Sequence, residues 1–156
     1  MKASTPLKAI LLASSLAAGL PAFAQAVGMT PVGHWQLFDE NSKQPYAIVE
    51  ISENQGEYLG HIRKVFPQPG EDPNPLCTQC SGELKNKPML GMRILSGLRQ
   101  EGDRYDNGVI LDPDEGKTYR CRITVLEGGK KLAVLFYLGS TLFGYTDTWL
   151  REGIRP

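Results

Sequence analysis

The segment KTYRCRITVLEGGKKLAVLFYL, residues 117–138, decides the fold class of this chain. Apolar and polar side chains alternate with a period of two in its first arm, as in a β-strand that buries one face, and its second arm is a short, mainly apolar run. The residues between the arms, EGGK at 127–130, include two glycines and favour a tight turn. The segment therefore predicts an antiparallel hairpin of strands 117–126 and 131–138.

The remaining apolar segments are also short, and Gly, Pro, Asn and Asp separate them. Besides the hairpin, we expect strands at 33–38, 46–52, 57–66, 89–95, 98–105 (weaker), 109–112 and 142–151, with turns at 39–43, 54–56, 107–108 and 112–116. No crossover helix is visible. Glycines expected inside strands favour sharply bent strands over a flat sheet; they are Gly60, Gly91, Gly139 and Gly144. The prediction is an all-β fold, an antiparallel up-and-down β-barrel of about eight strands, which removes exposed sheet edges.

The two ends of the chain carry a pattern that fits closure of such a barrel. Trp35 stands in the first expected strand, and Trp149 and Arg151 stand in the last. If these strands pair, the arginine can stack on a tryptophan face and close one end. The arrangement resembles the Gly-x-Trp motif and terminal arginine of lipocalins and other calycins.

A longer set of motifs extends over nearly the whole chain after residue 32. These motifs are GHW (33–35), AIVEI (47–51), GHI (60–62), CTQC (77–80), GVILDP (108–113), GKTYRC (116–121), LFG (142–144) and TWLR (148–151). Together they resemble the bacterial exported proteins of domain of unknown function family 2147. The resemblance implies a calycin-like, that is lipocalin-like, barrel with a signal peptide. It implies no agreed activity and no catalytic residues.

Residues 1–24 have the composition of a cleavable secretory signal. Two lysines precede the uncharged run AILLASSLAAGL at 9–20, and the small residues of AFA at 22–24 place the cut after Ala24. A retained membrane anchor is the alternative, but the apolar run is shorter than the ~20 residues that span a bilayer. A lipid anchor would need a cysteine at the cut, and the first cysteine is Cys77. We therefore expect residues 25–156 to form one β-barrel domain in the periplasm or outside the cell.

Charge and length restrict the partners of this domain. Removal of Lys2 and Lys8 turns the balance of 17 basic and 17 acidic side chains into an excess of two acidic ones. Basic residues are not clustered, so we expect no nucleic-acid partner, and no integral membrane segment after signal cleavage. We expect instead a small lipophilic or amphipathic ligand, or a protein partner in the envelope.

The three cysteines suggest different states. Cys77 and Cys80 form a Cys-x-x-Cys pair in a proline-rich loop, and in an oxidising compartment a local disulfide is the expected state. A redox-active pair and a metal site are the alternatives, but no helix and too few ligands accompany the pair. Cys121 shares its strand face with apolar residues and is expected to be a buried free thiol, with disulfide exchange as the alternative.

Polar residues expected in strands suggest a ligand site. By analogy with calycins that hold fatty acids, Arg120, Arg122 and Tyr145 could bind the polar end of an amphipathic ligand. Glu50 and Asp147 could balance these arginines inside the barrel. In the alternative interpretation, the arginines belong to a charged outer face that meets water.

Motifs of enzymes are lacking. There is no Gly-x-Ser-x-Gly, no His-Glu-x-x-His and no phosphate-binding glycine loop, so we name no catalytic residue, metal or cofactor. Binding of a small hydrophobic or amphipathic molecule is the leading hypothesis. A non-catalytic interaction module is the second, with an exposed apolar patch expected around residues 67–88. An enzyme is the third.

Overall fold

The hairpin predicted for strands 117–126 and 131–138 is present in the structure. β6 (Lys117–Leu126) pairs with β7 (Lys131–Tyr137) without interruption from Arg120 opposite Tyr137 to Leu126 opposite Lys131. A short 3₁₀ turn, η2 (Glu127–Gly129), connects them. The structure is a computed structural model that describes residues 29–156, so the expected signal at 1–24 lies outside the described residues.

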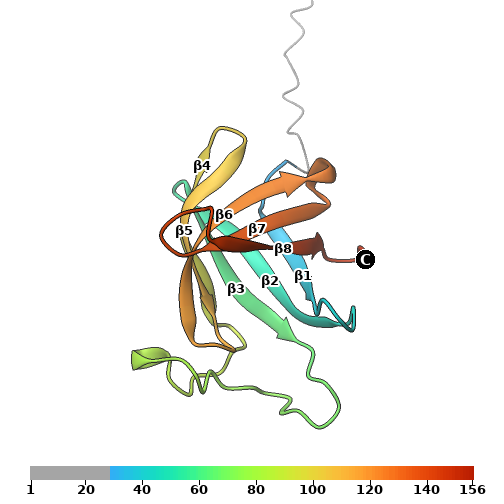
Figure 1. Cartoon of the computed structure of the whole chain (residues 1–156). Coiled ribbons are helices and arrows are strands. Elements are labelled where there is room, and N and C mark those ends of the chain that lie inside the picture. The colour runs from blue at the N-terminus through green and yellow to red at the C-terminus, as the bar shows by residue number, and fades with distance from the viewer. Residues whose placement is uncertain (1–28) are drawn as a thin grey trace, which may run out of the picture.

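Eight strands form one closed antiparallel barrel in sequence order, which confirms the predicted fold class (Figure 1). Each strand pairs with the next, and β8 pairs with β1 through Trp35 opposite Arg151 and Gln36 opposite Leu150. The other strands are β1 (Gly33–Phe38), β2 (Pro45–Asn54), β3 (Glu57–Val65), β4 (Arg93–Glu101), β5 (Arg104–Asp112) and β8 (Gly144–Arg151). The two residue pairs between β8 and β1 join the last strand to the first and close the sheet into a barrel.

The predicted boundaries are wrong between residues 89 and 112. Two long strands replace the three expected there, and the turn lies at Gly102 (φ 65°), because Glu101 pairs with Arg104. Asn107, at φ 62°, stands instead at an irregularity inside β5, where the register with β6 shifts between Tyr105 and Gly108. The sequence Asn-Gly favours the left-handed backbone conformation. Bulges and tight turns both use this conformation, so the sequence alone does not distinguish them here.

Of the four glycines expected inside strands, Gly60 and Gly144 lie there, whereas Gly91 and Gly139 lie in loops. Gly60 is required by close packing between β3 and β4. A Cβ atom at this position would lie 2.8 Å from the Cβ of Leu95. The absence of a side chain at Gly60 therefore lets β3 and β4 pack closely at this position.

One end of the barrel is closed by Trp35 and Arg151. Trp35 is fully buried, and the guanidinium carbon of Arg151 lies 4.3 Å from the centroid of its ring. Arg151 also donates hydrogen bonds to the carbonyl oxygens of Gly129 (2.5 Å), Val32 (3.2 Å) and Thr30 (3.3 Å). Trp149 is buried too, but it lies on the wall of the cavity described below.

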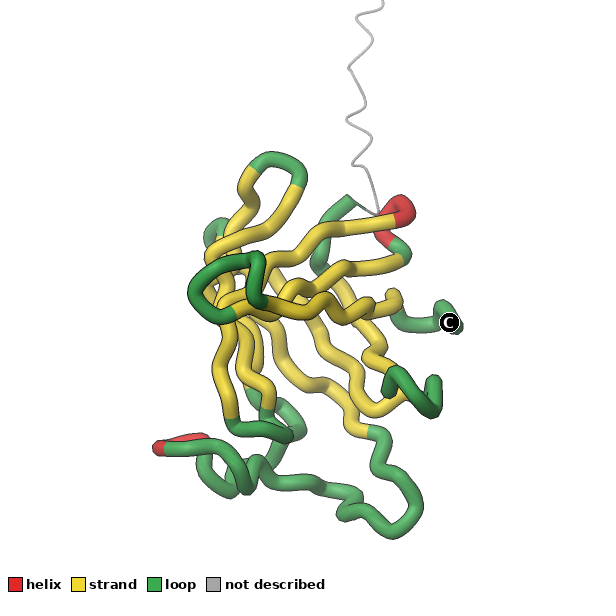
Figure 2. The backbone as a smooth tube through the Cα atoms, in the orientation of Figure 1, coloured by secondary structure: helices red, strands yellow, loops and turns green. Residues whose placement is uncertain are grey.

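A loop of residues 66–92 joins β3 to β4 and extends below the strands in Figure 2. It contains a single 3₁₀ turn, η1 (Gly82–Leu84). Within residues 29–156, no helix has the length and apolar character needed to span a membrane.

Candidate ligand-binding site

A cavity of about 1020 Å³ occupies the barrel and its mouth, a volume at the upper limit of small-molecule sites. Its deep part is apolar and is lined by Leu37, Val49, Ile62, Ile94, Ile110 and Trp149, all of them buried. The loops β1–β2, β3–β4 and β5–β6 supply its rim. In an up-and-down barrel these loops lie at the end opposite the Trp35–Arg151 closure, so the barrel is plugged at one end and hollow at the other.

β8 contributes one face to this cavity. Tyr145, Asp147 and Trp149 alternate along the strand, and all three line the cavity. Their partners in β7 are Phe136, Val134 and Leu132, each of which is buried. Period-two alternation therefore directs a carboxylate and two aromatic rings inward from one strand.

Aromatic rings cluster near the mouth. Phe136 and Tyr145 stack with centroids 4.8 Å apart and planes 5° apart, and Tyr119 packs edge-on against both, at 6.0 and 6.2 Å. The hydroxyl of Tyr119 donates a hydrogen bond to Glu115 (2.7 Å), which raises the pKa of Tyr119 to about 12. Of the three rings, those of Phe136 and Tyr145 line the cavity and present flat, rigid apolar surface to it.

Asp147 is fixed in position on the cavity wall. The indole Nε1 of Trp149 donates a hydrogen bond to Oδ2 (2.9 Å), and the amide of Thr148 donates one to Oδ1 (2.7 Å). Burial raises the pKa of Asp147 despite these bonds, and the charge of Glu40 adds to the effect. The wall thus holds a well-oriented carboxylate in a partly desolvated place.

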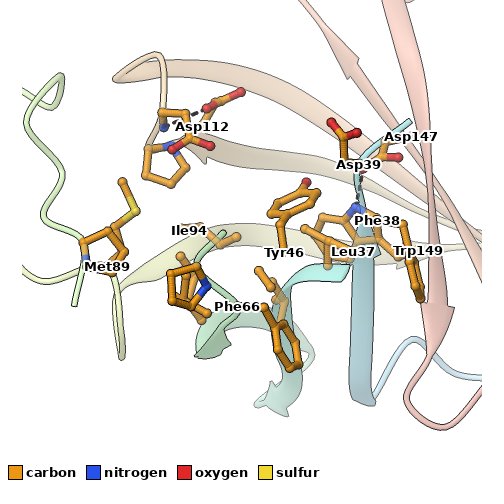
Figure 3. Close-up of a pocket in the computed structure, with 18 of the residues that line it drawn as sticks. Leu37, Phe38, Asp39, Tyr46, Phe66, Met89, Ile94, Asp112, Asp147 and Trp149 are labelled. Carbon is orange, nitrogen blue, oxygen red and sulfur yellow. Dashed lines mark hydrogen bonds between the residues drawn. The ribbon is translucent and has the colours of Figure 1, made fainter. Parts of the chain in front are cut away.

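Two more polar groups face the same space from other elements. Burial raises the pKa of Asp114 in the β5–β6 loop, and Asp112 and Glu71 raise it further. Burial also raises the pKa of Tyr46, with additional contributions from Asp147, Asp114 and Asp112. In Figure 3, Tyr46 lies between Asp112 on one side and Asp39 and Asp147 on the other.

The predicted Cys77–Cys80 disulfide is present and fastens the loop that forms one wall of the cavity. Both cysteines are buried, and Sγ of Cys77 lies 3.2 Å from the carbonyl oxygen of Pro113. The amide of Cys77 donates a hydrogen bond to Lys87 (2.8 Å), which closes the loop on itself. Only η1 follows the pair, so the loop lacks the α-helix start that activates thiols in redox enzymes.

Arg120 and Arg122 do not line the cavity, although the fatty-acid analogy placed them there. Cys121 and Ile123 face the core, so the alternating arginines point outward. Arg122 forms an ion pair with the buried Asp106 at 2.6 Å, and Arg120 is exposed. The two arginines therefore belong to the charged outer face of the barrel. Of the three residues expected to bind the ligand, only Tyr145 lines the cavity.

Glu50 and Asp147, the two carboxylates expected to balance these arginines, lie in different surroundings. Glu50 is paired with Arg63 (2.5 Å), a half-exposed residue, and does not line the cavity, whereas Asp147 does. The position of Asp147 could be predicted from the sequence, because it stands two residues before Trp149 and therefore lies on the same inward face of the strand. Tyr46, Asp112 and Asp114 come from strand ends and loops, where alternation gives no direction.

Cys121 is a buried free thiol, and burial raises its pKa to about 12. Its sulfur lies against the position of Gly108, where a Cβ atom would approach it to 2.6 Å. Among residues 29–156, no group of three or more His, Cys, Asp or Glu residues is arranged to hold a metal ion.

A closed eight-stranded antiparallel barrel with one plugged end and an apolar cavity is a lipocalin-like fold. The family model described as "Uncharacterized protein conserved in bacteria (DUF2147)" matches residues 33–151, and the chain belongs to this family. A similar solved structure is that of HP1028 from Helicobacter pylori, described as belonging to the lipocalin family. It has a TM-score of 0.65 and 22% identity, over 77% of this chain and 81% of that one. Comparison with curated proteins gives no match.

Proposed function

We propose that this protein is exported and encloses a small hydrophobic or amphipathic molecule in its barrel. The observation that carries the proposal is the cavity of about 1020 Å³, whose deep part is apolar and whose mouth is polar. Such a division suits a ligand with an apolar body and a polar end. The lipocalin description of HP1028 supports the same reading at the level of the fold.

Native mass spectrometry of protein purified gently from its own compartment tests this function. We expect added mass that disappears on denaturation. A bulky side chain in the cavity should abolish it, so we choose Ala47→Phe, at a buried position on the cavity wall. Ala133→Phe is the matched control, because Ala133 lies outside the cavity and alternates with inward-facing Leu132 and Val134.

Two substitutions test which residues contact the ligand. Tyr145→Ala should weaken binding several-fold, because it removes one ring of the stacked pair. Arg120→Ala should leave binding unchanged, because Arg120 is outside the cavity lining. A bare chain in native mass spectra, together with no binding across a panel of lipids and small apolar molecules, would contradict the function.

Export is part of the proposal and rests on the sequence of residues 1–24. N-terminal sequencing of protein from the periplasm or medium should begin at Gln25. Replacement of Leu11 and Leu12 by Arg should block export, because a charged residue interrupts the apolar run. Full-length protein in the cytoplasm of wild-type cells would contradict this part.

A protein-interaction module is the second candidate, and the loop joining β7 to β8 favours it. Leu142 is 86% exposed, Phe143 75% and Leu138 61%. The patch expected at 67–88 is smaller, with Leu76 and Leu84 each 41% exposed. Cross-linking in cells should capture one envelope protein through this loop, and Leu142→Ser with Phe143→Ser should abolish the capture. Failure to recover a reproducible partner would remove this candidate.

A further inference from the structure

The charge of the cavity restricts its occupant. Among the described residues that line it, seven are acidic and none is Lys, Arg or His. The acidic ones are Asp39, Glu40, Glu71, Asp72, Asp112, Asp114 and Asp147. They come from three loops and two strands, so the negative charge surrounds the mouth rather than following one segment.

None of these carboxylates forms an ion pair with another residue of the described segment 29–156, although the charge of Lys43 acts on Asp39 from a greater distance. The ion pairs found there involve Glu50, Glu57, Asp106, Glu115 and Glu127, and none of the seven cavity residues. Five acids outside the cavity thus pair with basic side chains, whereas none of the seven acids that line the cavity does. Four of them, Asp39, Glu71, Asp72 and Asp112, accept hydrogen bonds from backbone amides of their own turns, and these bonds stabilise the turns. The bonds do not neutralise the charges, so the carboxylates around the mouth still repel one another.

The aromatic residues of the cavity lie among these charges. Tyr46 is within electrostatic reach of Asp112, Asp114 and Asp147, and Tyr145 of Asp112 and Asp147. Ring faces and carboxylates both attract cations, and ring faces also tolerate the methyl groups of a quaternary ammonium. A fatty acid would place its carboxylate beside seven others, which is unfavourable.

We propose that the ligand is an amphipathic organic cation, a molecule with an apolar body in the barrel and an ammonium or amidinium group at the acidic mouth. The proposal rests on the proposed binding function and names its ligand class. An organic cation fits better than a metal ion, because the described carboxylates are spread around the rim and form no cluster of three or more that could hold one. The oriented Asp147, next to Trp149 and Tyr145, is the expected first contact of the charged group.

Three ligands of equal chain length test this inference: decylamine, decanol and decanoate, measured by isothermal titration calorimetry below their aggregation concentrations at pH 7.5. We expect decylamine to bind at least tenfold tighter than decanol, and decanoate to bind more weakly than either. Raising NaCl from 0.05 to 0.5 M should lower the affinity for decylamine and leave the affinity for decanol unchanged, because salt screens exposed charges.

A triple variant, Asp112→Asn, Asp114→Asn and Asp147→Asn, should bring the affinity for decylamine down to that for decanol. The matched control is Glu83→Gln, Asp103→Asn and Glu152→Gln, which removes the same charge outside the cavity and should change nothing. If the triple variant does not fold, Asp147→Asn alone is the second variant. Its side-chain oxygen can still accept the hydrogen bond from Trp149, so we expect it to fold. Because the charge is lost, its affinity for decylamine should still fall several-fold.

The outcomes separate the two proposals. Equal binding of all three ligands, or tightest binding of decanoate, would overturn the cation inference and leave the binding function intact. An equal loss of decylamine affinity in both triple variants would also overturn it, because the net charge of the protein would then explain the preference. Binding of none of the three would contradict the binding function itself.

Discussion

Arg151 is the residue on which closure of the barrel depends most. Its guanidinium stacks on Trp35 and donates hydrogen bonds to three backbone carbonyl oxygens, which otherwise lie at the ends of segments without strand partners. Few other side chains can do both, because a lysine offers a point charge and no flat face. One residue therefore ties β8 to the segment before β1 and to the β6–β7 turn.

We expect Arg151→Ala to destabilise the protein by about 2–3 kcal/mol, from the lost charged hydrogen bonds and the lost stacking on Trp35. Arg151→Lys should recover only part of this. Urea unfolding followed by tryptophan fluorescence measures the effect. Arg155→Ala is the control, since Arg155 is exposed and lies outside the strands. Equal stability of the two alanine variants would contradict the proposed role of Arg151.

At the residue scale, the sequence was informative where a strand face is regular. The alternation in 117–126 correctly separates Cys121 and Ile123 from the two arginines, which is why the charged outer face was a sound alternative. The fatty-acid analogy was misleading because it took the chemistry of the ligand from elsewhere. The acidic mouth of the cavity depends on loops that meet only after the barrel closes, and no local pattern contains that information.

The loop of residues 66–92 is the element in which stability and binding meet. Its residues Phe66, Pro67, Pro75 and Met89 line the cavity, and its disulfide packs against the β5–β6 turn. Gly116 in that turn leaves room for the loop, because a Cβ atom there would collide with the carbonyl of Gln79. The disulfide thus holds a wall of the cavity rather than the barrel itself.

Replacement of both Cys77 and Cys80 by Ala should lower the global stability by about 2 kcal/mol or less, because the bond closes a very short loop. The larger effect should be local, as faster proteolysis within 66–92 and weaker ligand binding. Limited proteolysis and titration calorimetry measure the two effects. In the wild type, thiol titration after denaturation should find one free thiol per chain, from Cys121. Unchanged proteolysis in the variant would show that other contacts hold the loop.

At the element scale, the turns explain which boundaries could be predicted. The β2–β3 turn has Gln55 and Gly56 at positive φ, and its position follows directly from the sequence. Asn107–Gly108 carries the same local signal but forms a bulge, because the strands on both sides continue their pairing. Local chemistry specifies a left-handed residue, whereas long-range pairing decides between a turn and a bulge.

The molecule as a whole combines a fold that the sequence predicts with a cavity that it does not. The strand pattern and the Trp35–Arg151 closure point to a barrel, and the barrel is observed. Several acids outside the cavity form ion pairs, as Asp106 does with Arg122 and Arg104, while the acids that line the mouth form none. We therefore expect the ionised form of a paired acid such as Asp106 to stabilise the fold, and the ionised form of Asp147 in the cavity to destabilise it.

Asp147 should destabilise the ligand-free protein at neutral pH. Because its pKa is raised above 3.8 on folding, stability falls as pH rises from the unfolded pKa through the folded one, and the loss is complete above the folded pKa. Asp147→Asn should therefore raise the Tm at pH 7, by on the order of 1–3 °C. The difference from wild type should close below pH 3.8, where Asp147 is protonated in both states.

Asp106→Asn should do the opposite, which makes it the control. Burial acts to raise the pKa of Asp106, but the Asn107 amide and Arg122 outweigh it and lower the pKa. Its ionised form therefore stabilises the fold above pH 3.8, and this contribution is lost as pH falls through the folded pKa. Differential scanning fluorimetry of both variants between pH 3 and 8 gives the two curves. If Asp147→Asn lowered the Tm at pH 7 as Asp106→Asn does, the cavity carboxylate would be a structural group, and its unpaired charge would no longer point to a cationic ligand.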